Sequence, residues 1–215
     1  MNFRMNTDKL RLYLVTDDTL AGGRLFEKVT AAVKGGVSMV QLREKNCTTA
    51  EFVSKGLRLK ELLTPYGVPL IINDRVDVAL AVGADGVHIG QSDMPCKIAR
   101  KLLGPDKIIG LSVESMEDVR SANLEDADYI GISPVFATPT KTDTADPFGL
   151  AGLARAVEES VHPAVAIGGI NLSNAGKIMA CGAAGIAVVS AILCAPDPFA
   201  AANKLLEITG NDKGV

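Results

Sequence analysis

The sequence is poor in aromatic residues and in histidine. Tryptophan is absent, aromatic residues make up 4% of the 215 residues, and there are two histidines. Proteins that bind single-stranded nucleic acid stack bases on aromatic rings, so this composition argues against such a surface. The formal net charge of -3 gives no electrostatic basis for binding a phosphate backbone either. We therefore expect no nucleic-acid partner.

Cysteines are few and scattered, and long apolar runs are missing. Cys47, Cys96, Cys181 and Cys194 form no C-x-x-C pair, and neither histidine stands at ligand spacing from them. This argues against a zinc site or a disulfide framework and favours the reduced thiols of the cytoplasm. The first residues lack the apolar core of a secretory signal, and no run is long enough to cross a bilayer. We expect a soluble cytoplasmic protein with no membrane partner.

What the sequence does contain is a regular alternation of short β-branched runs with amphipathic segments. Hydrophobic residues make up 47% and charged residues 22%, as in ordinary globular domains. The alternation predicts eight strands and eight helices. The strands are predicted at 10–16, 37–43, 69–73, 86–89, 107–113, 129–133, 164–168 and 186–190. The helices are predicted at 25–36, 48–67, 76–84, 94–104, 115–127, 150–160, 172–183 and 197–209.

Strict alternation of this kind is typical of parallel strands covered by helices. A doubly wound sheet is the alternative, but the first strand is followed by "VTDDTLAGGR" and not by a G-x-G-x-x-G fingerprint. We therefore predict an α/β fold, a compact (β/α)₈ barrel in which 1–215 form a single domain and 1–9 an N-terminal extension. Active sites of such barrels lie in the loops that follow the strands.

The end of the second predicted strand carries two cations and an amide. In "QLREK", Gln41, Arg43 and Lys45 are two apart and project to one face, while Leu42 and Glu44 take the other. Such a group at a barrel mouth suits a phosphate or diphosphate. The alternative is a solvated strand end that forms a salt bridge with a neighbouring carboxylate.

Two acids follow the third and fourth predicted strands. Asp74 comes after Asn73 in "INDR", and Asp93 precedes Met94-Pro95 in "HIGQSDMP". Each acid could simply cap the next helix. Two carboxylates on neighbouring strand ends, beside a cationic one, are also a suitable site for Mg²⁺, which is held by carboxylates and substrate phosphate oxygens.

The later strand ends favour a second anion site. Ser112 closes the fifth predicted strand and could donate to a phosphate oxygen or satisfy a turn. Gly168 and Gly169 follow the seventh, and Val189 and Ser190 close the eighth. The loops after strands 7 and 8 form the usual phosphate pocket of this fold.

A long polar loop at 136–149 separates the sixth predicted strand from its helix. It carries Thr138, Thr140 and Lys141 on a strip with almost nothing to bury, which favours a lid over phosphate chemistry. The two histidines, His88 and His162, are assigned no role. The sequence shows no Ser/His/Asp or Cys/His constellation for a protein nucleophile.

Six ordered motifs together resemble the thiamine-phosphate synthase family. They are "LYLVTD", "VQLREK", "INDR", "GVHIGQSDMP", "IGISPVFATPTKTD" and "IGGI", and the resemblance runs from about residue 10 to 205. It implies that hydroxymethylpyrimidine diphosphate is joined to a thiazole phosphate, with release of diphosphate, and of CO₂ where the thiazole is carboxylated. It also implies one Mg²⁺ ion and small-molecule substrates.

The resemblance implies a role for each matching residue. Gln41, Leu42, Arg43, Glu44 and Lys45 would bind the pyrimidine diphosphate, together with Asn73, Ser112 and Lys141; Thr138, Pro139, Thr140, Gly169, Val189 and Ser190 would bind the thiazole phosphate; Asp74 and Asp93 would hold Mg²⁺. Arg43, Lys45, Ser112 and Lys141 would act in catalysis by neutralising the departing diphosphate. One departure is Ser133 before Pro134, where many members have glycine.

Two alternatives stay open. A thiazole tautomerase of the same superfamily needs only one phosphate site, and a non-catalytic phosphate-binding barrel needs no acids opposite it. Retention of Arg43, Asp74, Asp93 and Lys141 weighs against both. A homo-oligomer is compatible with the pattern, because barrel helices bury one face whether or not they dimerise.

Overall fold

The computed structural model describes residues 6–138 and 146–210, and its strands close into a parallel barrel. Consecutive strands pair in order, and β1 also pairs with β8 to close the ring. This confirms the predicted (β/α)₈ barrel. The strands are Leu12–Val15 (β1), Met39–Leu42 (β2), Leu70–Asn73 (β3), Gly86–Ile89 (β4), Ile108–Val113 (β5), Tyr129–Ile132 (β6), Ala164–Ile167 (β7) and Gly185–Val188 (β8).

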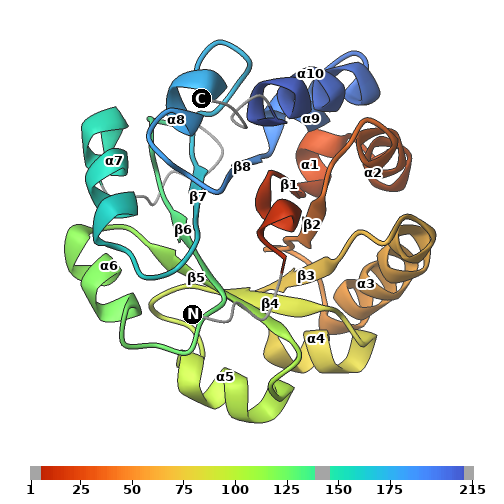
Figure 1. Ribbon diagram of the computed structural model, residues 1–215. Coiled ribbons are helices and arrows are strands. Elements are labelled where there is room, and N and C mark those ends of the chain that lie inside the picture. Colours follow the sequence, from red (N-terminus) through yellow and green to blue (C-terminus); the bar gives the residue numbers. More distant parts are fainter. Residues whose placement is uncertain (1–5, 139–145, 211–215) are drawn as a thin grey trace.

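Helices surround the barrel on the outside (Figure 1). No helix in the described residues is long and apolar enough to cross a membrane. The helices are Asp18–Ala21 (α1), Leu25–Lys34 (α2), Thr49–Leu63 (α3), Val76–Val82 (α4), Cys96–Leu103 (α5), Met116–Ala122 (α6), Gly149–Glu159 (α7), Ala175–Met179 (α8), Ser190–Leu193 (α9) and Pro198–Gly210 (α10), with 3₁₀ turns at Thr7–Leu10 (η1) and Thr64–Tyr66 (η2).

Several predicted boundaries are wrong by a few residues. Ser190 begins the short helix α9 and does not extend the eighth strand, and Leu10 belongs to a 3₁₀ turn and not to the first strand. Pro95 is the N-cap of α5, so this helix starts at Cys96 and not at Met94. The four-residue helices α1 and α9 were not predicted, because a single turn is too short to show a helical period.

The strands separate two apolar layers. Outward-facing residues such as Leu42 and Ile72 are fully buried against the helices. Inward-facing residues, among them Tyr13, Met39 and Tyr129, fill the barrel. This is the alternation that the period-2 strand geometry requires, so polar residues at inward positions near the strand ends open onto the barrel mouth.

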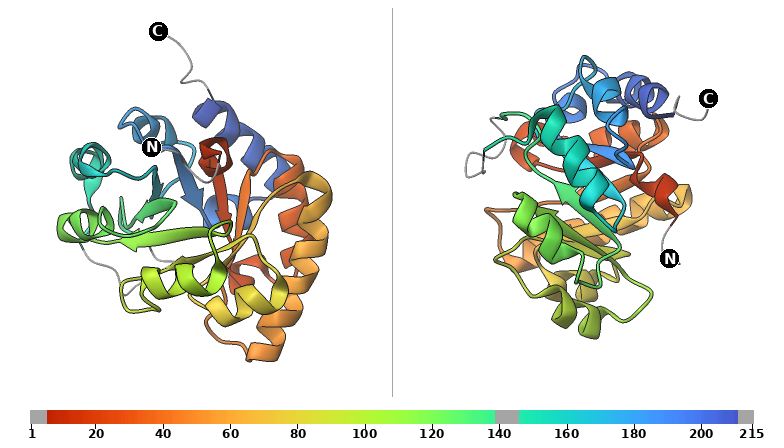
Figure 2. Two further views of the ribbon diagram at one scale, coloured as in Figure 1. Left: turned by 60° about the horizontal axis from the view of Figure 1, so that its bottom comes forward. Right: turned by 60° about the vertical axis from the view of Figure 1, so that its left-hand side comes forward.

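Helix packing closes the outside of the barrel where its first and last β/α units meet. Helices α2 and α10 lie side by side in all three views (Figures 1 and 2). Gly35, at the end of α2, has no side chain, and a Cβ there would overlap the backbone of Phe199 and lie 2.9 Å from Ala202 Cβ. Glycine is therefore needed for this close approach.

Two acids tie the amino ends of the strands together. Asp128 Oδ2 accepts the Ile109 N–H at 2.8 Å and pairs with Arg100 Nη2 at 2.6 Å. Asp85 Oδ2 accepts the Leu70 N–H at 2.8 Å and pairs with Lys60 Nζ at 2.7 Å. Both acids therefore satisfy backbone amides at the end of the barrel opposite the mouth.

Candidate active site

A polar cavity of about 370 Å³ opens at the carboxyl ends of the strands. Its wall is built by inward-facing residues of the barrel and by the loops after β2, β3 and β4. The structure brings the following predicted site residues together around it: Gln41, Arg43, Lys45, Asn73, Asp74, Asp93 and Ser112. Ser133, the departure from the family pattern, also lines this cavity.

The end of β2 divides its side chains as strand alternation requires. Gln41, Arg43 and Lys45 line the cavity, whereas Leu42 is fully buried in the apolar layer between strands and helices. Glu44 points away from the cavity toward α3. Contact of Leu42 with a cavity ligand is therefore limited to its backbone.

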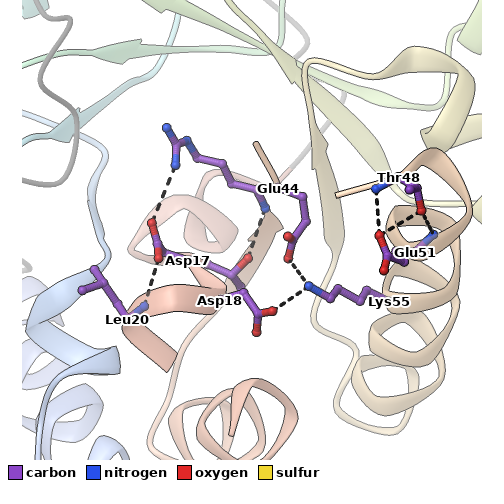
Figure 3. Close-up of polar contacts among 9 residues, drawn as sticks. Asp17, Asp18, Leu20, Glu44, Thr48, Glu51 and Lys55 are labelled. Carbon is purple, nitrogen blue, oxygen red and sulfur yellow. Dashed lines mark hydrogen bonds and ion pairs between the residues drawn. The ribbon is translucent and has the colours of Figure 1, made fainter. Parts of the chain in front are cut away.

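An ion-pair network holds the segment that carries these cations (Figure 3). Lys55 Nζ lies 3.0 Å from Glu44 Oε1 and 2.7 Å from Asp18 Oδ2. Burial lowers the pKa of Lys55, but the hydrogen bonds to Asp18 and Glu44 outweigh burial and raise it. The Lys55 ammonium thus links α3 to α1 and to the loop after β2. A capping box of Thr48 and Glu51 starts α3 beside it.

Asp17 orients Arg43 and was not recognised from the sequence. Asp17 Oδ2 lies 3.8 Å from Arg43 Nη1, and its other carboxylate oxygen accepts the Leu20 N–H at 3.0 Å to cap α1 (Figure 3). The backbone N–H of Arg43 donates to Thr16 Oγ1 at 3.1 Å. Asp17, the N-cap of the short helix α1, is therefore the acid that pairs with the guanidinium at the mouth.

The two predicted metal ligands face the cavity. Asp74 pairs with Lys45 Nζ at 2.7 Å, and Asp93 Oδ2 accepts the Gly90 N–H at 2.6 Å. Burial raises the pKa of Asp93, and the nearby Asp74 carboxylate adds to the rise. Neither acid acts as the predicted helix cap, because α4 and α5 have Arg75 and Pro95 at their N-caps without side-chain capping.

The Asp74 backbone is unusual. Among the residues that the structure describes, Asp74 is the one non-glycine residue with a positive φ, 61°. Its N–H donates to the His88 carbonyl at 2.8 Å, which fixes the turn after β3. Strained backbone is concentrated at binding sites, where it aims a side chain. Asp74 and Asp93 line the same cavity, and carboxylate oxygens are the kind of hard ligand that suits Mg²⁺.

His88 lies in the cavity wall, although it was assigned no role from its place in the sequence. Its Nε2 lies 2.8 Å from Ser112 Oγ, and its Nδ1 lies 2.9 Å from the Tyr129 hydroxyl. Burial lowers the pKa of His88 to about 4, so the ring is neutral near pH 7. Barrel closure brings His88 on β4 and Ser112 on β5 together, a contact that was not predicted from the sequence. His162 instead contacts the Ala122 carbonyl at 2.9 Å.

A second, smaller pocket of about 90 Å³ adjoins the cavity. Gly168, Gly169, Val189 and Ser190 line it, together with Thr138. Gly169 has φ 65°, and a Cβ there would lie 2.8 Å from Phe136 Cβ, so glycine is required. The two spaces share five lining residues: Val15, Arg43, Ser133, Ile167 and Ala187. Arg43 thus stands at their junction.

The predicted lid loop 136–149 is described at its two ends. Phe136 N–H donates to the Gly168 carbonyl at 3.1 Å, and Phe148 N–H donates to the Pro134 carbonyl at 2.9 Å. Pro139, Thr140 and Lys141 lie outside the described residues. The anchored ends place the start of the loop beside the smaller pocket.

The thiamine monophosphate synthase family model matches residues 12–192. The chain belongs to this family. It is 58% identical over 201 residues to the thiamine-phosphate synthase of Albidiferax ferrireducens, a match that covers 93% of this chain and 91% of the relative. It is 49% identical to the corresponding protein of Clostridium novyi, with 92% of this chain and 98% of that one covered. The chain is accordingly an enzyme, a transferase.

Solved structures agree with this assignment. Thiamine phosphate pyrophosphorylase from Pyrococcus furiosus superposes with a TM-score of 0.89 at 41% identity, covering 97% of this chain and 99% of that one. A 3-hexulose-6-phosphate synthase superposes with a TM-score of 0.67 at 18% identity, over 92% of this chain and 99% of that one. The second match shows the shared fold alone.

Proposed function

We propose that the chain joins 4-amino-2-methyl-5-(hydroxymethyl)pyrimidine diphosphate to a thiazole ethyl phosphate, giving thiamine phosphate and diphosphate, in a Mg²⁺-dependent reaction. Where the thiazole is carboxylated, CO₂ is also released. The supporting observation is the pair of adjoining spaces, one lined by cations and acids and the other by glycines, with Arg43 at their junction. Two anionic substrates that must meet require this arrangement.

The pyrimidine diphosphate fits the larger cavity. Gln41 and Asn73 are buried amides at its floor and can donate to and accept from the pyrimidine edge. Arg43 and Lys45 line the same wall and can neutralise the diphosphate. The Ser112 hydroxyl adds a hydrogen-bonding group from β5.

Asp74 and Asp93 are the residues that would hold Mg²⁺. Their oxygens face one cavity, and the raised pKa of Asp93 reflects burial and a neighbouring carboxylate, a charge pair that a divalent cation would relieve. When bound, the ion would neutralise charge on the diphosphate oxygens. Lys45, which pairs with Asp74 here, would then be available to the diphosphate.

The proposed chemistry needs no protein nucleophile. The bond between the methylene carbon and the diphosphate oxygen breaks, and the electron pair leaves with diphosphate. The amino-substituted pyrimidine stabilises the developing methylene cation, and the thiazole nitrogen forms the new bond. The positive charges of Arg43 and Lys45 are in position before the bond breaks. Such preorganised charge is the main way in which a protein accelerates a step of this kind.

The thiazole phosphate fits the smaller pocket. Backbone around Gly168 and Gly169 can approach an anion closely because neither residue has a Cβ. Val189 and Ser190 complete the wall, and Thr138 brings the start of the loop 136–149 to it. Pro139 and Thr140, which follow Thr138 in the chain, are proposed to contact the same phosphate.

Lys141 is proposed to close over the diphosphate from the loop 136–149. Lys141→Ala should then lower turnover by about 10²- to 10³-fold, because it removes one charge from the transition state. Its free energy of unfolding should change far less. Near-normal turnover in this variant would exclude the lid role.

Product analysis with both substrates and Mg²⁺ tests the proposed function as a whole. We expect thiamine phosphate and diphosphate in equal amounts. Isomerised thiazole without diphosphate would identify a tautomerase. Binding of both substrates without any product, under saturating Mg²⁺, would identify a non-catalytic barrel. Either of the last two results would overturn the proposal.

A further inference from the structure

Five polar side chains from five strands form a continuous hydrogen-bonded chain across the cavity floor. Gln41 Nε2 lies 2.7 Å from the Tyr13 hydroxyl, and the Tyr13 hydroxyl lies 3.0 Å from that of Tyr129. The Tyr129 hydroxyl lies 2.9 Å from His88 Nδ1, and His88 Nε2 lies 2.8 Å from Ser112 Oγ. All five residues line the cavity.

The first link sets the direction of the others. The Gln41 amide nitrogen can only donate, so the Tyr13 hydroxyl accepts. The Tyr13 hydroxyl is buried, and among the described residues its other hydrogen-bonding partner is the Tyr129 hydroxyl, so its own proton is satisfied by donation to Tyr129. By the same requirement the proton of the Tyr129 hydroxyl goes to His88 Nδ1. A neutral imidazole that accepts at Nδ1 carries its proton on Nε2. His88 therefore donates to Ser112 Oγ.

We infer that this one-way chain makes the Ser112 hydroxyl a hydrogen-bond donor to the cavity ligand, and that His88 is a positioning residue which acts through Ser112. Because Nε2 already carries a proton, it cannot accept the proton of Ser112, and that proton is available to an acceptor in the cavity. The identity of this acceptor, an oxygen of the diphosphate, rests on the proposed function. The direction of the hydrogen-bonded chain does not depend on the proposed function.

The same direction explains why a Ser/His pair at 2.8 Å does not make Ser112 a nucleophile. Activation of serine requires the facing imidazole nitrogen to be unprotonated, so that it can take the hydroxyl proton. In His88 the unprotonated nitrogen is Nδ1, which faces Tyr129. The pair therefore supplies an oriented donor and not a base.

Neighbouring strands leave space for this chain. Gly110 on β5 is in register with His88 on one side and with Tyr129 on the other. A Cβ at Gly110 would overlap the Tyr129 hydroxyl and His88 Nδ1, and one at Gly131 would lie 3.0 Å from His88 Cε1. Gly110 on β5 and Gly131 on β6 thus leave room for the His88–Tyr129 contact.

The tautomer of His88 tests the inference on substrate-free protein. The sequence contains two histidines, so two-bond ¹H–¹⁵N correlation spectra of untagged protein can be assigned with a His162→Gln variant. We expect His88 to carry its proton on Nε2 near neutral pH. A proton on Nδ1 would reverse the chain and overturn the inference. This result can be read whether or not the proposed reaction is found.

A double-mutant cycle, measured by kinetics, tests whether the hydrogen-bonded chain acts through Ser112. Tyr129→Phe removes one hydroxyl and keeps the ring, and we expect kcat to fall about tenfold, as for a lost hydrogen bond to a charged group. In a Ser112→Ala background, Tyr129→Phe should lower the rate measured by single-turnover kinetics by less than about twofold. Equal losses in both backgrounds would overturn the inference.

A matched control uses Tyr66, which lies on the outer surface and is 43% exposed. Tyr66→Phe makes the same chemical change away from the cavity, so it should leave kcat unchanged. If it lowered kcat as much as Tyr129→Phe does, the loss would not arise from the chain, and the inference would fail.

Discussion

The two ends of the barrel carry the same kinds of charged residue and use them differently. At the amino end, Asp128 is almost fully buried and bonds both a backbone amide and Arg100. At the carboxyl end, Asp74 and Asp93 line an open cavity, and Asp74 pairs with a Lys45 side chain that is 50% exposed. The first arrangement is closed to further ligands and the second is open to them.

This difference separates stability from function. A carboxylate that completes the bonding of buried amides stabilises the fold, and its loss leaves those amides unpaired. A carboxylate held on a strained turn beside another acid contributes little to the fold and is suited to bind a cation. The same substitution, aspartate to asparagine, should therefore have opposite consequences at the two ends.

The largest effect is expected for Asp74→Asn. Asparagine tolerates the positive φ at this position, so the fold should persist, and kcat should fall about 10²- to 10³-fold as metal binding weakens. The free energy of unfolding should change by less than about 1 kcal/mol, because the pair with Lys45 is partly exposed. Steady-state kinetics and urea denaturation measure the two quantities. Full activity in this variant would remove the proposed metal site.

The matched change at the other end is Asp128→Asn. Its free energy of unfolding should fall by about 3 kcal/mol, because Arg100 loses its buried partner. The kcat of the protein that remains folded should be close to that of the unmodified chain. Urea denaturation and an active-site titration give these values. A loss of kcat without a loss of stability would contradict the assigned role of this end.

Gly169→Ala tests the smaller pocket. The new Cβ would be strained at φ 65° and would press on Phe136, so the pocket wall must shift. Strain of about 1–3 kcal/mol should raise KM for the thiazole phosphate by roughly tenfold. KM for the pyrimidine diphosphate should be unaffected. A rise in the second value alone would mean that the two substrates are exchanged between the pockets.

The smallest effect is expected for Lys60→Met at the amino end. Asp85 would keep its bond to the Leu70 amide, and the lost ion pair is about one-third exposed on both sides. Stability should fall by less than about 1 kcal/mol, with no change in kcat. If Lys60→Met lowered stability as much as Asp128→Asn, solvent exposure would not determine how much each ion pair at the amino end contributes to stability.

Much of the fold and the site could be predicted because both follow strand alternation. Inward positions at strand ends gave Gln41, Arg43, Lys45 and Ser112, and the structure places all of them at one cavity. Alternation also separated Glu44 from its cationic neighbours, and Glu44 indeed bonds to Lys55. These features depend on residues that are close in the sequence, and the period-2 alternation of side chains along a strand is enough to predict them.

The rest depends on contacts that no local pattern contains. Asp17 orients Arg43 through a one-turn helix, which is too short to have a period. His88 meets Ser112 and Tyr129 because the barrel closes with a particular register between β4, β5 and β6. From sequence, a histidine inside a strand could not be distinguished from an ordinary core residue.

The most direct test of the account is anomalous diffraction from crystals soaked with Mn²⁺ and diphosphate. We predict one Mn²⁺ between the Asp74 and Asp93 carboxylates, with diphosphate contacting Arg43 and Lys45, and Lys45 moved from the 2.7 Å contact with Asp74. Diphosphate bound elsewhere, with the Lys45–Asp74 pair intact and no anomalous peak beside it, would contradict the proposed role of the carboxyl end.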